Sequence, residues 1–224
     1  MKLVCTPLSI VAPAIVLLAT AVRETSAATL VVSNSTDSSA GSLRATVTSA
    51  ASGDIITFAA GLAGQKIVLT SGEILLNKNL TIDGSALANR IQINGNHASR
   101  VFNVQSNSTV FLNQLTITNA FIPDDVGGGI YNEGLLTVSN CTFARNWSGS
   151  AGGAIHSEGG ALAVRNSTFF ANTSADEGGA ISEHGSLRIV NSTFTANTAN
   201  AGGGLRIITV GDGDPTSVVS DSSI

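Results

Sequence analysis

Three side chains in the middle of the 224-residue chain have the types and spacing of a ligand-binding group: Glu133, His156 and Glu158. Each glutamate follows a repeated isoleucine, Ile130 or Ile155, by three residues. In a structure that stacks such repeats, the two carboxylates should lie along one edge with His156 beside them. A carboxylate near an imidazole can perform acid–base chemistry on a polysaccharide, and carboxylates can bind Ca²⁺.

The same pattern also fits a solvated turn edge, because Glu133 and Glu158 each stand directly before a glycine. Glu183 is expected to join this acidic line loosely, with His184 beside it. The remaining acidic pairs, such as Asp124 and Asp125 in an expected surface loop, have no basic or nucleophilic partner at a useful spacing. We therefore predict no catalytic residue, no metal site and no cofactor. We retain Glu133, His156 and Glu158 only as a candidate ligand edge.

The elements that position these residues are repeated. A Gly-Gly-x-Ile/Leu signature alternates with an Asn-x-Thr-Phe-x-x-Asn signature at spacings of 24 to 26 residues. A fixed period of this size indicates stacked structural repeats. The repeat positions are Gly127, Gly128, Ile130, Asn140, Phe143, Asn146, Gly152, Gly153, Ile155, Asn166, Phe169, Asn172, Gly178, Gly179, Ile181, Asn191, Phe194, Asn197, Gly202 and Gly203.

Alternating apolar residues before each Asn, as in Leu136-x-Val138, predict short strands. The chain is therefore expected to be all-β, with about six coils of a parallel β-solenoid over residues 66–210. Equivalent Phe and Ile side chains should stack inside. Asn140, Asn166 and Asn191 should form an amide ladder at a bend, and the paired glycines should allow tight corners.

Residues 29–65 should form an N-terminal cap that covers the first coil. Ser42 is a candidate N-cap of a short amphipathic helix, Leu43 and Val47 share one face, and Gly53 is expected to stop the helix. Arg44 should make ion pairs or hydrogen bonds within the cap. Residues 211–224 are expected to be a flexible tail or a truncated end.

Residues 1–28 have the features of a secretory signal peptide: Lys2, a long apolar run and small residues before an expected cleavage after Ala27 or Ala28. Cleavage leaves 9 basic and 14 acidic residues, a net charge of −5. No basic cluster remains, so no nucleic-acid partner is expected. No transmembrane segment is expected after cleavage. Cys141 would be the one remaining cysteine and is interpreted as a small core residue.

The Gly-Gly-[Ala/Gly]-[Ile/Leu] and Phe-x-x-Asn repeats resemble those of the polymorphic outer membrane proteins, which are surface-exposed bacterial adhesins and autotransporter passengers. The stretch from Gly41 to Arg44, followed by Ile56–Phe58, resembles the "CSLREAI" start of exported bacterial β-helix proteins, although Gly41 replaces the cysteine. The resemblance covers about residues 29 to 205. It implies a right-handed parallel β-helix that is exported to the outer membrane, the cell surface or the medium.

These observations together predict an exported, non-catalytic protein that acts in adhesion or surface display. The expected partner is an unidentified surface ligand, either a glycan or a host or neighbouring cell surface. The alternative is a carbohydrate-active β-helix protein, either a polysaccharide lyase or hydrolase or a glycan-binding module. Ice binding is disfavoured because Thr142, Thr168 and Thr193 supply only one outward threonine ladder.

Overall fold

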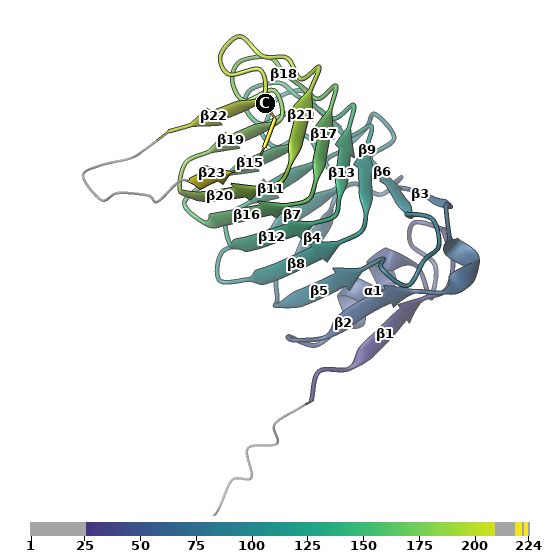
Figure 1. Cartoon of the computed structure of the whole chain (residues 1–224). Helices are drawn as coiled ribbons and strands as arrows, with labels where there is room; N and C mark the ends of the chain where they lie inside the picture. The colour runs from purple at the N-terminus through teal and green to yellow at the C-terminus, as the bar shows by residue number, and fades with distance from the viewer. Residues whose placement is uncertain (1–25, 209–217, 221, 224) are drawn as a thin grey trace, which may run out of the picture.

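The computed structural model describes residues 26–208, 218–220, 222 and 223. Parallel strands stack into a β-helix, with the first strands and the helix at one end and the C-terminal residues at the other (Figure 1). Residues 1–25 of the expected signal peptide and residues 209–217 lie outside the described residues.

Four parallel sheets form the walls of the solenoid. Sheet A contains β1 (Thr29–Val32), β2 (Ile55–Phe58), β5 (Leu80–Asp83), β8 (Thr109–Asn113), β12 (Leu135–Ser139), β16 (Ala161–Arg165), β20 (Ser186–Val190) and β23 (Val218–Ser220). Sheet B contains β3 (Lys66–Val68), β6 (Gln92–Asn94), β9 (Thr116–Thr118), β13 (Thr142–Ala144), β17 (Thr168–Phe170) and β21 (Thr193–Thr195).

Sheet C contains β4 (Ile74–Leu76), β7 (Phe102–Val104), β11 (Ile130–Asn132), β15 (Ile155–Ser157), β19 (Ile181–Glu183) and β22 (Leu205–Ile207). Sheet D contains β10 (Phe121–Ile122), β14 (Trp147–Ser148) and β18 (Thr173–Ser174). One 3₁₀ turn spans Ala60–Leu62. The six strands in each of sheets B and C agree with the predicted number of coils. Sheet A is longer because β1 and β2, inside the expected cap, already pair with it.

The core follows the repeat. Phe143, Phe169 and Phe194 pair in register and stack face to face, with ring centroids 4.8 and 4.6 Å apart and planes 3° from parallel. Ile130, Ile155 and Ile181 form a second fully buried column. Because identical side chains occupy identical levels, the packing found in one coil also serves the next. The predicted phenylalanine and isoleucine columns are confirmed.

The two glycines of each pair are required for different reasons. Gly152 has φ +64°, in the left-handed region that disfavours residues with a Cβ. A Cβ on Gly153 would lie 2.3 Å from the carbonyl oxygen of Gly179 and 2.5 Å from that of Thr173. The first glycine therefore makes the corner, and the second lets neighbouring backbones approach each other.

The expected amide ladder of Asn140, Asn166 and Asn191 is only partly formed. Asn191 donates from Nδ2 to Oδ1 of Asn166 at 2.8 Å, and Asn140 donates in the same way to Asn113. No described hydrogen bond joins Asn140 to Asn166. Asn140, Asn166 and Asn191 lie near the surface with positive φ. Their side chains take part in two separate pairs, Asn166 with Asn191 and Asn140 with Asn113, rather than in one ladder.

A continuous amide ladder instead lies at the Phe-x-x-Asn positions, inside the solenoid. Asn146 donates to Asn172 at 2.9 Å, and Asn172 donates to Asn197 at 3.0 Å. Each Nδ2 also donates to the carbonyl oxygen of the stacked core residue one coil earlier, such as Phe143 for Asn172. Each amide oxygen also accepts a backbone N–H from the preceding coil. This ladder provides hydrogen-bond partners for backbone N–H and carbonyl groups at the corner between sheets B and D.

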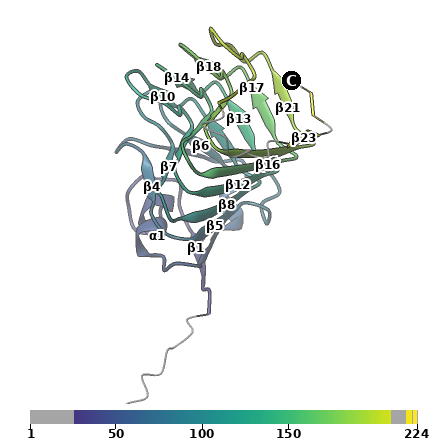
Figure 2. The ribbon, with the colours of Figure 1, turned by 90° about the vertical axis from the view of Figure 1, so that its left-hand side faces the viewer.

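The helix α1 (Leu43–Ser49) covers the first coil, and Figure 2 shows it beside β1 and β4. Leu43 and Val47 are buried beneath it, as predicted. Arg44 donates from Nε to Oδ1 of Asp37 at 2.9 Å, which is the expected contact within the cap. It also donates to the carbonyl oxygens of Gly72 and Glu73, which lie in the first coil outside the expected cap.

The expected helix stop at Gly53 is wrong. The helix ends at Ser49 because Ala50 adopts an extended conformation while its N–H still donates to the Thr46 carbonyl oxygen. Gly53, with φ +97°, serves the following turn into β2.

We expect Ser42→Ala to lower the free energy of unfolding by about 1 kcal/mol. Ser42 is fully buried, and its side chain accepts a hydrogen bond from the Ala45 N–H at 3.2 Å. Urea unfolding of the purified protein measures the change. Ser42→Thr, which keeps the hydroxyl, should lose less. Equal stabilities for the wild type and the alanine variant would contradict the capping role.

Part of the expected C-terminal tail belongs to the solenoid. In β23, Val218, Val219 and Ser220 pair in parallel with Arg188, Ile189 and Val190 of β20. The carbonyl oxygen of Ser223 also accepts a hydrogen bond from the Phe194 N–H at 2.8 Å. Backbone pairing of this kind is incompatible with a free tail at these positions. Oγ of Ser222 accepts a hydrogen bond from the Ser192 N–H at 3.1 Å, and the other tail residues lie outside the described part of the chain.

Candidate functional site

The candidate edge is built by the residues that directly follow the strands of sheet C. Glu133 follows β11, Glu158 follows β15 and His184 follows β19. The Glu158 N–H donates to the Asn132 carbonyl oxygen, and the His184 N–H donates to that of Ser157. The three residues are therefore equivalent positions in successive coils. The sequence signal for His184 was its place three residues after Ile181, the same offset as for the two glutamates.

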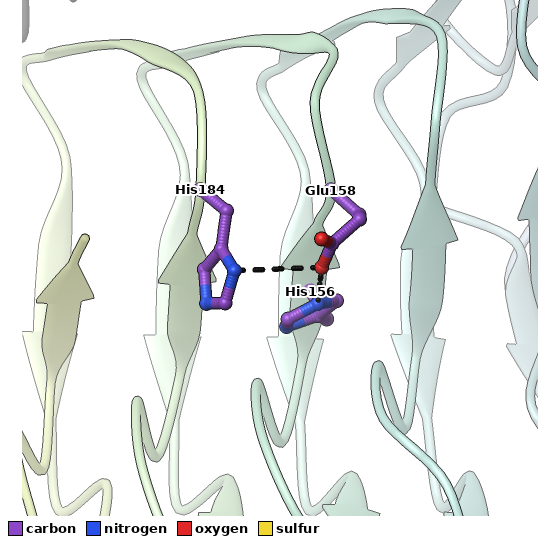
Figure 3. A group of neighbouring side chains, drawn as sticks. All are labelled: His156, Glu158 and His184. Atoms are coloured by element: carbon purple, nitrogen blue, oxygen red, sulfur yellow. Dashed lines mark hydrogen bonds and ion pairs between the residues drawn. The ribbon is translucent and has the colours of Figure 1, made fainter. Parts of the chain in front are cut away.

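His156, Glu158 and His184 form a compact group, shown in Figure 3. Nε2 of His156 lies 3.0 Å from Oε2 of Glu158, and Nδ1 of His184 lies 3.4 Å from the same oxygen. The rings of His156 and His184 meet edge to face, with centroids 5.0 Å apart. Two of the predicted edge residues, His156 and Glu158, are thus in direct contact, and His184 completes the group.

Glu133 lies one step away from this group. Its Oε1 accepts a hydrogen bond from the Tyr131 hydroxyl at 3.4 Å, and the Tyr131 ring stacks on His156 with centroids 5.9 Å apart. The guanidinium of Arg100 also lies over the Tyr131 ring, with its central carbon 5.3 Å from the ring centroid. Glu133 is therefore linked to His156 indirectly, because Tyr131 contacts both residues.

Arg100 shows that Asp125 does have a basic partner, contrary to the sequence-based expectation. The guanidinium of Arg100 lies 2.7 Å from Asp125 and 2.6 Å from Glu73. The partner stands 25 residues upstream, which is one coil of the solenoid. Burial alone would raise the pKa of Asp125, but the Val126 N–H and Arg100 outweigh it and hold the pKa below its ordinary value.

The group continues toward the C-terminal coils through Glu177. Oε1 of Glu177 lies 3.5 Å from Nε2 of His184, and its Oε2 lies 3.2 Å from Nε of Arg206. A polar chain thus runs along the outer face of sheet C, and we call it the sheet C network. Its members are Glu73, Arg100, Asp125, Tyr131, Glu133, His156, Glu158, Glu177, His184 and Arg206.

Burial sets the protonation of the network's centre. The His156 side chain is only 4% exposed, and this burial lowers its pKa despite the hydrogen bond with Glu158. The ring is therefore neutral at pH 7. Burial together with the negative charges of Glu133 and Glu158 raises the pKa of Tyr131 above its ordinary value. Burial thus favours the uncharged forms of both His156 and Tyr131 at the centre of the network.

Glu183 does not belong to the acidic line, and this expectation is wrong. Successive residues of a strand point to opposite faces. Glu183 pairs in register with Ser157, points into the solenoid and is fully buried. Burial raises its pKa to about 8, and the nearby Ser157 hydroxyl and Gly185 N–H only moderate this effect. Neither carboxyl oxygen makes a well-aligned hydrogen bond with a described residue. The edge position at this level belongs to His184.

Cys141 is buried in the core, as expected for a small structural residue. Burial raises the pKa of its thiol to about 11, so it is not a reactive thiolate at neutral pH. The side chain of His97, in the turn between β6 and β7, is exposed. The sheet C network is thus where two of the chain's three histidines meet several of its acids.

An open groove of about 380 Å³ adjoins the network at Glu133, at the bend between sheets C and A. Asn107, Glu133, Leu135 and the backbone of Gly159 contribute to its lining. Leu135 is 53% exposed. The groove does not include His156 or His184, so it is a neighbouring feature and not a cleft around them.

Comparison with known families identifies the repeat. The model of the Chlamydia polymorphic membrane protein (Chlamydia_PMP) repeat matches residues 140–158. A search of the curated proteins found no match. Among the described residues, no helix is both long and apolar enough to cross a bilayer. The matched segment begins at Asn140, includes Phe143 and the Gly152–Gly153 pair, and ends at Glu158 of the candidate site. The chain is a parallel β-helix repeat protein that carries the polymorphic membrane protein repeat.

Proposed function

We propose that this protein is exported and acts, without catalysis, in adhesion or display at the bacterial outer membrane or cell surface. The polymorphic membrane protein repeat supports surface association, because the same signatures occur in surface-exposed bacterial adhesins. Its partner would be a glycan or another molecule on a host or neighbouring cell.

The variation along sheet C carries this proposal. Its inward column repeats one type of side chain, with Ile130, Ile155 and Ile181 in register. Its other column changes at every coil and reads Asn103, Tyr131, His156, Ser182 and Arg206. His156 and Ser182 are buried in this column, whereas Asn103, Tyr131 and Arg206 are accessible. A purely structural face, or one that matches a periodic lattice, would repeat as the core does. A face that keeps a regular backbone but varies its chemistry suits recognition of an irregular molecular surface.

A glycan-binding module is the second candidate, and the groove beside Glu133 favours it. Sugar rings present hydroxyls on their edges and C–H groups on their faces. The groove offers both kinds of partner, the carboxylate of Glu133 and the exposed side chain of Leu135. Its openness suits the side of an extended polysaccharide better than a small molecule, which is usually enclosed.

Protease shaving of intact producing cells, with the medium and periplasm assayed alongside, tests display. Cell-bound chain that is removed by protease supports it. Chain found only in the periplasm contradicts it, and chain found in the medium restricts the proposal to a secreted form.

We expect Glu158→Ala to reduce binding of the purified protein to target cells by less than about threefold. Adhesion through a long face draws on several contacts, and few single residues at such interfaces are dominant. A compact carbohydrate site that depends on Glu158 would instead lose about tenfold or more, equivalent to 1.4 kcal/mol. Binding isotherms of wild type and variant on cells and on immobilised glycans separate the two. Glu133→Ala, which alters the groove, is the matched variant for the glycan alternative.

A further inference from the structure

The donor atoms of three side chains converge at the centre of the sheet C network. Oε2 of Glu158 lies 3.0 Å from Nε2 of His156 and 3.4 Å from Nδ1 of His184. One atom from each of the three residues lies within 4.8 Å of the other two. Ligands at about 2.0–2.1 Å from a tetrahedral Zn²⁺ are about 3.4 Å apart. The distance of 3.4 Å between Oε2 and Nδ1 of His184 equals this value, and the distance of 3.0 Å between Oε2 and Nε2 of His156 has to lengthen slightly when an ion binds.

We propose that His156, Glu158 and His184 form a binding site for a divalent transition-metal ion of the zinc class. The ligands are Nε2 of His156, Nδ1 of His184 and the carboxylate of Glu158. Two imidazoles and one carboxylate suit Zn²⁺ and its neighbours Co²⁺, Ni²⁺ and Cu²⁺. Ca²⁺ and Mg²⁺ take sets of oxygen ligands instead, so they are not the expected ions.

The fold holds the ligands in place before any ion arrives. His156 is part of β15, and its ring is confined between Tyr131 on one side and the edge of His184 on the other. Glu158 and His184 directly follow strands that are hydrogen-bonded to each other. A site on paired strands therefore requires little reorganisation to bind.

Glu177 lies beside the other ring nitrogen of His184. Metal-binding histidines usually donate their other ring N–H to a carboxylate, which fixes the tautomer. Nε2 of His184 faces Oε1 of Glu177 at 3.5 Å, and Arg206 holds the other oxygen of Glu177 at 3.2 Å. Nε2 is buried and lacks a well-aligned hydrogen bond with any described residue. With an ion on Nδ1, the proton must reside on Nε2, where it points toward Glu177.

The charge of the network favours a divalent cation. Two guanidinium groups, Arg100 and Arg206, face more carboxylates than they can neutralise. The network holds five carboxyl groups against these two guanidinium groups: Glu73, Asp125, Glu133, Glu158 and Glu177. The site is also accessible, because the side chains of Glu158 and His184 are 52% and 22% exposed. Water can therefore complete the coordination.

Titration of Zn²⁺ into the purified chain, without a polyhistidine tag and in competition with a chromophoric chelator at neutral pH, tests the site. We expect one Zn²⁺ per wild-type chain. His184→Ala and Glu158→Gln should each weaken binding by at least about tenfold. Glu177→Gln should weaken it by about tenfold, because it alters the carboxylate that faces Nε2 of His184. His97→Ala removes an exposed histidine that is not among the three proposed ligands and should leave binding unchanged. Zn²⁺ should also raise the Tm of the wild type but not that of His184→Ala.

Two results would overturn the site. One is the absence of saturable Zn²⁺ binding to the wild type. The other is a Zn²⁺ affinity of His184→Ala and Glu158→Gln that equals that of the wild type. A loss of affinity in His97→Ala as large as in these two variants would also overturn the site, because either result places the ion elsewhere. Co²⁺ provides a separate readout, since its visible absorption reports a site with few ligands and should be lost with His184. Circular dichroism of each variant confirms that the β-helix is intact.

Discussion

Asn172→Ala should lower the free energy of unfolding by about 3–5 kcal/mol. The Asn172 side chain is fully buried and makes four hydrogen bonds. Its oxygen accepts from the backbone N–H and the side-chain amide of Asn146, and its Nδ2 donates to Oδ1 of Asn197 and to the Phe143 carbonyl oxygen. Truncation leaves the Asn146 N–H and the Phe143 carbonyl oxygen buried without these partners, at about 1–3 kcal/mol each.

A matched control lies in the same coil. Asn166→Ala makes the same chemical change at an exposed pair, where one hydrogen bond to Asn191 is lost and a φ of +47° becomes less favourable. We expect a cost of about 1–2 kcal/mol there. Urea unfolding followed by circular dichroism gives both values. If the two variants lose the same stability, the inner ladder has no special role in the stack.

These two asparagines show what the repeat reveals and what it hides. Both recur at a fixed spacing, and the sequence alone does not tell which one faces the core. The outcome depends on the backbone. Asn166 has a left-handed φ at the corner between sheets A and B, whereas Asn172 lies at the next corner, between sheets B and D, and its side chain is buried. The stacking itself was predictable, because period-2 alternation and recurring glycine pairs restrict the chain to short parallel strands.

The candidate site was predictable in part for the same reason. The offset of three residues from the repeated isoleucines places Glu133 and Glu158 in one column, as expected. His184 also follows a repeated isoleucine, Ile181, by three residues and lies in the same column. Glu183 follows it by only two residues and points inward, because successive residues of a strand point to opposite faces. The contact of Arg100 with Asp125 was missed because their coil lies upstream of the regular repeats, where the alignment is loose. Contacts between coils need the register, which only the structure supplies.

Glu183→Gln should change the pH dependence of stability by about 4 kcal/mol between about pH 5 and pH 9. In the folded chain, burial raises the pKa of Glu183 to about 8, whereas the ordinary value of 4.5 applies after unfolding. Between these values the folded state binds more protons than the unfolded state, so the free energy of unfolding decreases as the pH rises. The decrease ends above about pH 8, when Glu183 is ionised in both states.

The glutamine variant removes this titration while nearly preserving the shape of a side chain that is stacked in register with Ser157 and, one coil further on, Ile207. Its stability relative to the wild type should therefore be lowest in acid and should improve steadily toward alkaline pH. The difference between the two proteins, measured by urea unfolding at each pH, cancels the contribution of His156, whose lowered pKa acts in the acid range. A difference that stays constant with pH would mean that the Glu183 carboxyl is hydrated or paired in the folded protein. The expected slope instead identifies a neutral acid inside the solenoid, at the position directly before His184 of the candidate site.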